Sequence, residues 1–269
     1  MENQPPGLGR TVSTIIATWM YSPERTVPIH MPPTITDGDL VVELHPEAVR
    51  ARSRRSWTFP RYQGSVCPRC GNPLERGSPR PTCGVCDLFE GVSSVMYIGV
   101  FDHGSTDDLR EGIRELKDNA SELYANLFGI SLALIVNHES PGLKAGSVLV
   151  PIPSHPLDHP GRAFIPSQAI ARTLARHTGM PCEPGLLAKD RPHAQKGTAI
   201  DDARYPNVDG VFQANGPMDG RNVIIVDDVM ATGATLAECA RQCLGAGARR
   251  VDALVVGRHF IFREGRSYE

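Results

Sequence analysis

Four of the seven cysteines have the spacing of a metal site. Two Cys-x2-Cys pairs are separated by twelve residues, and their thiols belong to Cys67, Cys70, Cys83 and Cys86. Two residues between thiols allow a tight turn to direct both sulfurs at one ion, so two such pairs supply a closed tetrahedral zinc site. Disulfides and redox chemistry are the alternatives. A reducing cytosol disfavours disulfides, and four thiolates leave no open coordination position for a reaction. The pattern therefore predicts structural Zn²⁺.

A second stretch joins an apolar strand to two acids and a loop of small residues. Val223–Val226 is followed by Asp227 and Asp228, and then by the loop Ala231–Thr235. Backbone N–H groups of this loop and of the helix after it can bind a phosphate, with two threonine hydroxyls as further donors. The carboxylates would repel the phosphate but accept hydrogen bonds from neighbouring ribose hydroxyls. The stretch predicts a site for a phosphorylated sugar, and the alternative is a strand that ends in a solvated acidic turn.

This second stretch resembles the motif with which type I phosphoribosyltransferases bind phosphoribosyl pyrophosphate (PRPP). Over about residues 65–260 the chain is similar to the ComF family, which is competence-associated and phosphoribosyltransferase-like and carries a four-cysteine zinc element before this domain. The other segments similar to this family are Ile113–Lys117, Val150–Ser154, Arg191–Gln195 and Arg204–Phe212. The family's Arg-Gly-Phe-Asn-Gln appears here in altered form at Arg162–Gln168, and residues 1–62 match nothing in the family.

The resemblance implies transfer of a phosphoribosyl group from PRPP to a nitrogenous base, with pyrophosphate leaving from C1 of the ribose. Mg²⁺ would be held chiefly by substrate oxygens and would stabilise the charge of the leaving group. Asp227 and Asp228 are then the candidate catalytic residues. The candidate substrate-binding residues are Lys117, Pro153, Ser154, Arg191, Lys196, Ala231, Thr232, Gly233, Ala234 and Thr235. Lys189 is a further candidate for the diphosphate charge, and ordinary surface charge is the alternative for each lysine and arginine.

A non-enzymatic function is the second hypothesis. In it the domain binds PRPP or a nucleotide as a sensor or adaptor, and the zinc element or the segment Arg50–Tyr62 contacts a protein or single-stranded DNA. Five arginines cluster there around three aromatic residues, a composition that can bind phosphates and stack bases. The alternative is a solvated linker whose aromatic residues dock on the zinc element. The altered stretch Arg162–Gln168 favours the adaptor, whereas the intact acid pair and loop favour retained ligand binding.

Alternating strands and helices must position these groups. The pattern predicts strands at Val95–Phe101, Ser147–Ile152, Asn222–Val226 and Val251–Val256, and helices from Thr106 and at Ser121–Val136, Ser167–His177 and Thr235–Gly245. Such alternation indicates a parallel sheet, and ligands bind at the carboxyl ends of its strands. We therefore expect an α/β protein, a parallel-sheet type I phosphoribosyltransferase fold with a small N-terminal zinc-binding module.

Four segments are expected along the chain. They are an N-terminal extension of unknown fold at 1–62, the four-cysteine module at 63–92, the phosphoribosyltransferase-like domain at 93–260 and a tail at 261–269. Within the extension, Thr14–Met20 and Asp39–Leu44 have β-rich composition.

The composition is that of an ordinary globular chain. The 269 residues are 41% hydrophobic and 22% charged, with a net charge of −2, so overall charge attracts neither nucleic acid nor an anionic surface. No window is apolar enough to cross a membrane, and the first residues lack the basic region of a signal peptide. These features predict a cytoplasmic protein without a membrane partner.

Overall fold

The computed structural model describes residues 29–36, 39–44, 56–59, 65–74, 83, 86, 90–101, 108–158, 163–191 and 208–261. The β-rich run Thr14–Met20, the cap at Thr106, most of Arg50–Tyr62 and the candidate Lys196 lie outside these residues.

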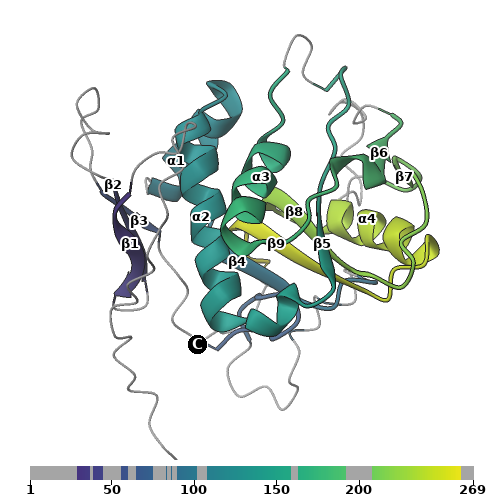
Figure 1. The fold of residues 1–269 in the computed structure, drawn as a ribbon, viewed down its shortest axis with the longest axis horizontal. Helices are drawn as coiled ribbons and strands as arrows, with labels where there is room; N and C mark the ends of the chain where they lie inside the picture. Colours follow the sequence, from purple (N-terminus) through teal and green to yellow (C-terminus); the bar gives the residue numbers. More distant parts are fainter. Residues whose placement is uncertain are drawn as a thin grey trace, which may run out of the picture.

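The core is a four-stranded parallel sheet (Figure 1). Its strands are β4 (Val95–Val100), β5 (Ser147–Pro151), β8 (Asn222–Met230) and β9 (Arg250–Arg258), in the order β4-β9-β8-β5. All four predicted strands are present, and the expected α/β fold with a parallel sheet and a cysteine cluster near the N-terminus is confirmed. The two central strands are longer than predicted, which matters for the site below.

Helices cover both faces of this sheet (Figure 1). On one face lie α1 (Asp108–Asp118), α2 (Glu122–Glu139) and α3 (Pro166–Thr178); on the other lies α4 (Ala234–Gly245), with the two-stranded antiparallel ribbon β6 (Leu187–Lys189) and β7 (Phe212–Ala214). Two 3₁₀ turns, η3 (Pro141–Lys144) and η4 (Pro184–Leu186), lie before β5 and β6.

The period of two along β8 explains the layering. Ile224 and Val226 pack in the cluster of α1, α2 and α3, whereas Val223 and Ile225 pack in the cluster that contains α4 and the four cysteines. Successive strand residues point to opposite faces, so a run of apolar residues requires cover on both sides. All four are fully buried, as this arrangement demands.

A small antiparallel sheet precedes the cysteines. It consists of β1 (Ile29–Thr36), β2 (Asp39–Leu44) and β3 (Ser56–Phe59) in that order, and it lies beside α1 and α2 (Figure 1). The β-rich interpretation of Asp39–Leu44 is confirmed. The linker interpretation is wrong for Ser56–Phe59, because these residues pair with β2 as a strand.

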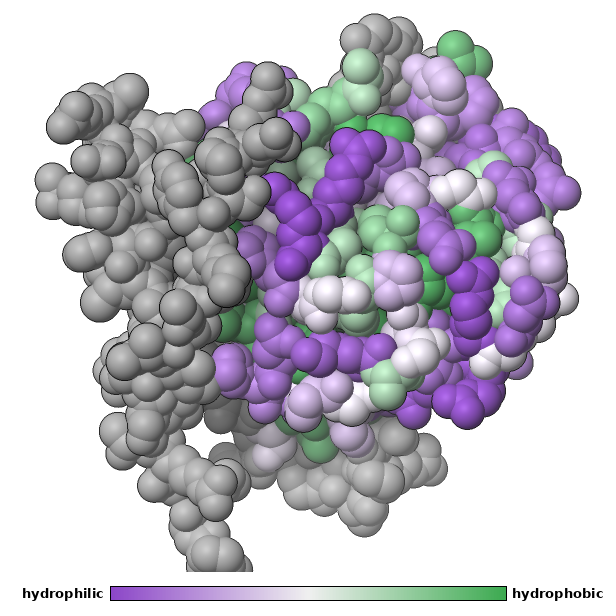
Figure 2. Space-filling model, viewed as in Figure 1, coloured by the Kyte–Doolittle hydropathy of each residue, from purple (hydrophilic) through white to green (hydrophobic). Residues whose placement is uncertain are grey.

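The described surface is mixed in polarity. Figure 2 shows hydrophilic residues around small hydrophobic patches on the viewed face. Among the described residues, Leu157 and Leu244 are the large hydrophobic side chains that stand exposed, at 66% and 37%. No helix among these residues is both long enough and apolar enough to span a bilayer.

The contact between α2 and α3 requires a glycine. A Cβ atom at Gly129 would lie 2.5 Å from the Cβ of Thr173 and 2.8 Å from the carbonyl oxygen of Ile170. The Thr173 hydroxyl in turn donates a buried hydrogen bond of 2.7 Å to the side-chain oxygen of Asn126 on α2. The backbone of α2 at Gly129 therefore packs directly against the Thr173 side chain and the Ile170 carbonyl of α3.

We expect Gly129→Ala to destabilise the protein by about 1–3 kcal/mol, because the overpacking outweighs the gain of about 1 kcal/mol in helix propensity. The matched control is Gly142→Ala, where the added methyl group meets no atom within 4 Å. Urea denaturation followed by circular dichroism measures both. Equal stability of the two variants would show that the helix contact tolerates a methyl group.

Candidate ligand site and candidate metal centre

The acid pair lies in the last part of β8. The strand pairs with β5 only as far as Pro151 opposite Val226, whereas its pairing with β9 continues through Asp227 opposite Val255 and on to Met230. The acids are therefore part of the strand, and the expectation that the strand ends at Val226 is corrected. Beyond the end of β5 one edge of β8 has lost its neighbour, and the site opens there.

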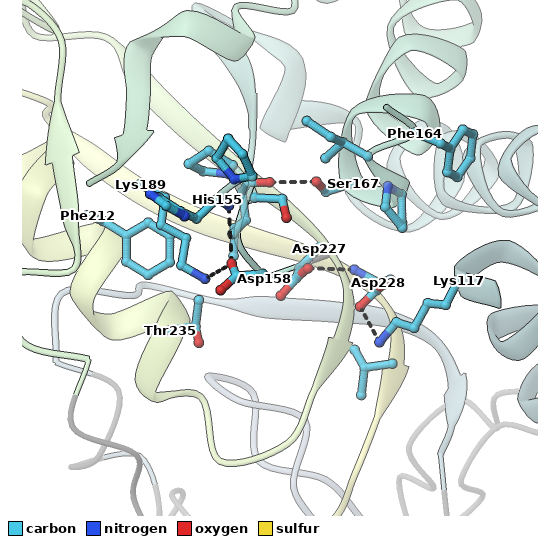
Figure 3. Close-up of a pocket in the computed structure, with 17 residues that line it drawn as sticks. Lys117, His155, Asp158, Phe164, Ser167, Lys189, Phe212, Asp227, Asp228 and Thr235 are labelled. Atoms are coloured by element: carbon cyan, nitrogen blue, oxygen red, sulfur yellow. Dashed lines mark hydrogen bonds and ion pairs between the residues drawn. The ribbon is translucent and has the colours of Figure 1, made fainter. Parts of the chain in front are cut away.

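A cavity of about 430 Å³ lies at this edge (Figure 3). Its walls come from the ends of α1 and β8, the segment after β5, the start of α3, the β6–β7 ribbon and the first turn of α4. The residues that line it are Lys117, Ile152, Pro153, Ser154, His155, Pro156, Asp158, Phe164, Ile165, Pro166, Ser167, Lys189, Phe212, Asp227, Asp228, Val229 and Thr235. The sheet thus brings both acids, two candidate lysines, and Pro153, Ser154 and Thr235 around one space.

Lys117 is bonded to the acid pair. It lies in the last turn of α1, and its Nζ is 3.1 Å from Oδ1 of Asp228. The lysine side chain is 40% exposed and that of Asp228 is 12% exposed, so the pair borders the cavity with one end open to solvent (Figure 3).

The first of the two acids, Asp227, has a raised pKa. Burial raises the pKa of Asp227 to about 7, and the neighbouring Asp228 carboxylate contributes to the rise. The N–H of Asp228, which donates to Oδ1 of Asp227 at 2.9 Å, opposes this rise, and so does the charge of Lys117. Two adjacent carboxyl groups in one partly buried site favour a proton, a cation or a hydroxyl donor beside them.

A second ion pair lies at the opposite end of the cavity (Figure 3). Lys189 Nζ is 2.5 Å from Oδ2 of Asp158, and both side chains are almost fully buried. The ammonium group also lies 5.7 Å from the centre of the Phe212 ring, and the N–H of His155 donates to the same carboxylate oxygen. Sequence reasoning missed the role of both partners: Asp158 belongs to no motif, and Phe212 was noted only as the end of a family-like segment, because only the fold brings them to Lys189.

The loop before α4 contributes less to the cavity wall than expected. Of Ala231–Thr235, Thr235 lines the cavity. Gly233 has φ of 84°, a left-handed conformation that few other residues adopt without strain, and it caps the helix. The N–H of Ala234 donates to Oγ1 of Thr232 at 3.4 Å. The chain therefore turns tightly from β8 into a helix whose N-terminus lies beside the acids.

The segment after β5 is held on two sides where it leaves the strand. Ile152 donates its N–H to the carbonyl of Val226 at 3.0 Å and accepts a 2.6 Å hydrogen bond from the Ser167 hydroxyl at the start of α3. Pro153 and Ser154 follow directly and line the cavity. The altered family segment also supplies wall residues, among them Phe164.

One of the remaining candidate cations lies outside the cavity, and the other lies outside the described residues. Arg191 is exposed and donates to the carbonyl of Gly210 at 3.0 Å, outside the cavity wall. Lys196 falls in residues that the structure does not describe.

The four cysteines form one buried cluster. Their sulfurs all lie within 4.8 Å of one another, with Cys67 3.2 Å from Cys86 and Cys70 3.3 Å from Cys83. Zn–S bonds of about 2.3 Å in a tetrahedron separate sulfurs by about 3.8 Å, so the donor set fits zinc. Burial raises the pKa of Cys86 to about 12, and a cation is what makes such thiolates stable together. The cluster is compatible with structural zinc.

We expect about one zinc ion per chain in protein purified under reducing conditions, and a lower Tm after chelation, because ligation contributes folding energy. Elemental analysis and thermal unfolding measure the two quantities. Cys70→Ser should lose the metal, whereas Cys182→Ser, a half-buried thiol outside the cluster, should keep it. Metal-free wild-type protein would contradict the four-thiolate interpretation.

We expect Asp227→Asn to raise Tm at pH 8 by a few degrees, at about 2–4 °C per kcal/mol. The native pKa near 7 exceeds the ordinary value of 3.8, so ionisation of Asp227 costs stability as pH rises from about 4 to 7. Asparagine removes that cost and can still accept the Asp228 N–H.

The gain should shrink towards pH 4.5, where the native carboxyl is already protonated. Asp219→Asn, at an exposed turn, is the matched control and should change Tm little at either pH. A lower Tm for Asp227→Asn at pH 8 would contradict a stability cost of ionising Asp227.

Known proteins resemble this chain over most of its length. The DNA utilization protein YhgH of Salmonella typhi is 30% identical over 193 residues, which cover 71% of this chain and 83% of that protein. YhgH of Escherichia coli K12 is 29% identical over the same span of 193 residues. Ribose-phosphate pyrophosphokinase 2 of Archaeoglobus fulgidus is 51% identical over 93 residues, 35% of this chain and 28% of that protein.

No protein-family model matches the chain. The similarity to YhgH nevertheless extends over more than two thirds of both proteins at 30% identity, and the four-cysteine cluster and parallel sheet agree with the family features expected from the sequence. The chain belongs to the ComF-like family of the DNA utilization protein YhgH.

Proposed function

We propose that this protein binds PRPP together with Mg²⁺ in the cavity at the end of β8 and transfers the phosphoribosyl group to a nitrogenous base, releasing pyrophosphate. One observation carries the proposal: the adjacent carboxylates Asp227 and Asp228 line a single cavity whose two ends hold Lys117 and Lys189. The similarity to a ribose-phosphate pyrophosphokinase supports a phosphorylated ribose as the ligand.

The charges in the cavity are sorted in a way that suits such a ligand. The carboxylates accept hydrogen bonds from the ribose hydroxyls, which relieves the repulsion between Asp227 and Asp228. The N-terminus of α4, with the Thr235 hydroxyl, binds a phosphate through backbone dipoles and N–H groups. Ser154 and the more accessible Lys117 face the diphosphate, while Lys189 adds positive charge at the other end of the cavity.

The oxygen-rich donor set fits Mg²⁺, which prefers carboxylate and phosphate oxygens and keeps several waters. When bound, the ion neutralises the leaving diphosphate. Asp227 and Asp228 orient the ribose, and Phe164 and Phe212 limit the access of water from the two ends of the cavity. We also propose that zinc binds the four clustered cysteines and stabilises the fold.

The name of the relatives favours a second candidate function. In it the protein binds PRPP or a nucleotide without turnover and acts as an adaptor in DNA utilization, with the zinc element or Arg50–Tyr62 contacting a protein or single-stranded DNA. Where the adaptor binds PRPP, the two candidates share the ligand and differ in turnover and in DNA binding.

Phosphorus NMR of PRPP and Mg²⁺ with a panel of nucleobases tests the proposal. We expect the PRPP signals to broaden on binding and pyrophosphate to accumulate with one base. Asp228→Asn should weaken binding by about tenfold or more, equivalent to about 1.4 kcal/mol, because it removes a charged acceptor. Asp219→Asn is the control and should bind normally.

The outcomes separate the candidates. Broadening without pyrophosphate supports the adaptor, which then requires salt-dependent binding of single-stranded DNA that is lost when the arginines between Arg50 and Arg61 are replaced. PRPP signals that neither broaden nor decline would refute the transferase and the PRPP-binding form of the adaptor.

A further inference from the structure

A buried arginine at the end of β9 joins the cysteine cluster to the loop before α4. Arg258 is the last residue of β9 and is fully buried. Its guanidinium donates to the carbonyl oxygen of Cys70 at 3.3 Å and to that of Ala231 at 2.9 Å. Cys70 is one of the four clustered cysteines, and Ala231 begins the loop that leads into α4. One side chain therefore contacts both candidate sites.

Further hydrogen bonds hold this guanidinium on each side. On the loop side, the carbonyls of Met230 and His259 accept from it, the first at 3.3 Å. On the cysteine side, Oδ1 of Asn72 lies 3.5 Å from Nη2 of Arg258 and accepts the N–H of Ile261 at 2.8 Å. A planar guanidinium with fixed donors satisfies several acceptors only while all of them keep their positions.

Charge adds to this geometric coupling. A buried guanidinium is costly unless acceptors or opposite charge surround it. Four thiolates around a divalent ion carry net negative charge, and the hydrogen bond to the carbonyl of Cys70 places Arg258 beside one of these residues. A metal in the cluster would therefore fix the turn that contains Cys70, and the thiolates that it keeps deprotonated would offset the charge of the buried guanidinium.

We propose that Arg258 is a positioning residue through which the metal in the four-cysteine cluster holds the loop Ala231–Thr235 in its phosphate-binding geometry. This inference rests on the proposed function, since that function supplies the phosphate ligand of the loop. Met230 is the last residue of β8, two positions after Asp228, and Ala231 follows it. A shift of their carbonyls moves the end of that strand and the first turn of α4 together, so metal occupancy and ligand affinity are coupled.

Substitution of Arg258 tests the coupling in the full chain. Arg258→Met removes the donors and the charge, and Arg258→Lys keeps the charge but cannot reach all the carbonyls. Calorimetry should show PRPP–Mg²⁺ affinity reduced about tenfold or more in both. The control is Arg249→Met, because Arg249 is exposed at the other end of β9 and bonds Asn222.

Zinc content and circular dichroism report whether each variant is folded and loaded. A general structural role would lower Tm without a change in affinity, whereas a positioning role lowers affinity in folded, zinc-loaded protein. Affinities within twofold of wild type in both Arg258 variants would overturn the proposal.

A second measurement needs neither ligand binding nor a stable Arg258→Met variant. Zinc is exchanged for the larger Cd²⁺ in the wild-type chain, and methionine methyl groups are followed by ¹³C NMR, with Met230 assigned through Met230→Leu. We expect the Met230 signal to shift between the two metal forms, whereas Met180, which packs in the cluster on the opposite face of the sheet, serves as the unmoved reference.

The Met230 shift should disappear in Arg258→Lys. An unmoved Met230 signal in wild type, or a shift that persists in Arg258→Lys, would overturn the coupling. A metal-dependent Met230 signal in a protein that binds no PRPP would instead refute the proposed function and leave the coupling intact.

Discussion

The site depends on the unequal lengths of neighbouring strands. β8 pairs with β9 along its whole length but loses β5 after Val226, so the next residues are held by the sheet on one edge and open on the other. Asp227 and Asp228 stand at this step, with the backbone held by pairing of Asp227 with Val255 and of Val229 with Gly257 on β9. Burial at this position is the main cause of the raised pKa of Asp227, and the Asp228 carboxylate, which the strand holds close by, adds to the rise. Such stored electrostatic strain is typical of sites that bind a cation or donor ligand.

Two internal ion pairs moderate that strain from opposite ends of the cavity. Lys117 comes from α1 and compensates Asp228, while Lys189 comes from the β6–β7 ribbon and compensates Asp158. Their environments differ: Lys117 is 40% exposed, whereas Lys189 is buried against Phe212. A screened, exposed pair exchanges partners at small cost, but a buried pair loses much more when one partner is removed. A ligand would therefore displace the carboxylate partner of Lys117 more readily than that of Lys189.

The cysteine cluster is part of the same core as the sheet. The four thiols pack in one hydrophobic cluster with Val223, Ile225 and Leu236, and the turn after Cys67 donates and accepts hydrogen bonds with the chain around β4. The N–H of Val95 bonds the carbonyl of Arg69 at 2.7 Å, and the Arg69 side chain bonds the carbonyl of Val92. Metal ligation at such a position stabilises the sheet itself, in contrast to a zinc element joined by a free linker. This integration is why a residue at the end of β9 can contact both the cysteines and the ligand loop.

Local patterns in the sequence were sufficient for the strands of the parallel sheet and for groups that lie along one segment. Apolar runs located those four strands, the Cys-x2-Cys spacing identified the four cysteines that cluster, and the order of acids, small residues and helix predicted the turn from β8 into α4. These features depend on neighbours within a few residues, whose geometry the backbone dictates. Tertiary structure alone decided that β8 continues through the acids, because the sequence of β8 does not show how far the strand pairs with β9. It also decided that Arg191 stays outside the cavity, that Asp158 neutralises Lys189, and that Arg258 links Cys70 to Ala231. Each of these joins residues far apart in the chain, and no local periodicity records which distant groups a fold will bring within hydrogen-bonding distance.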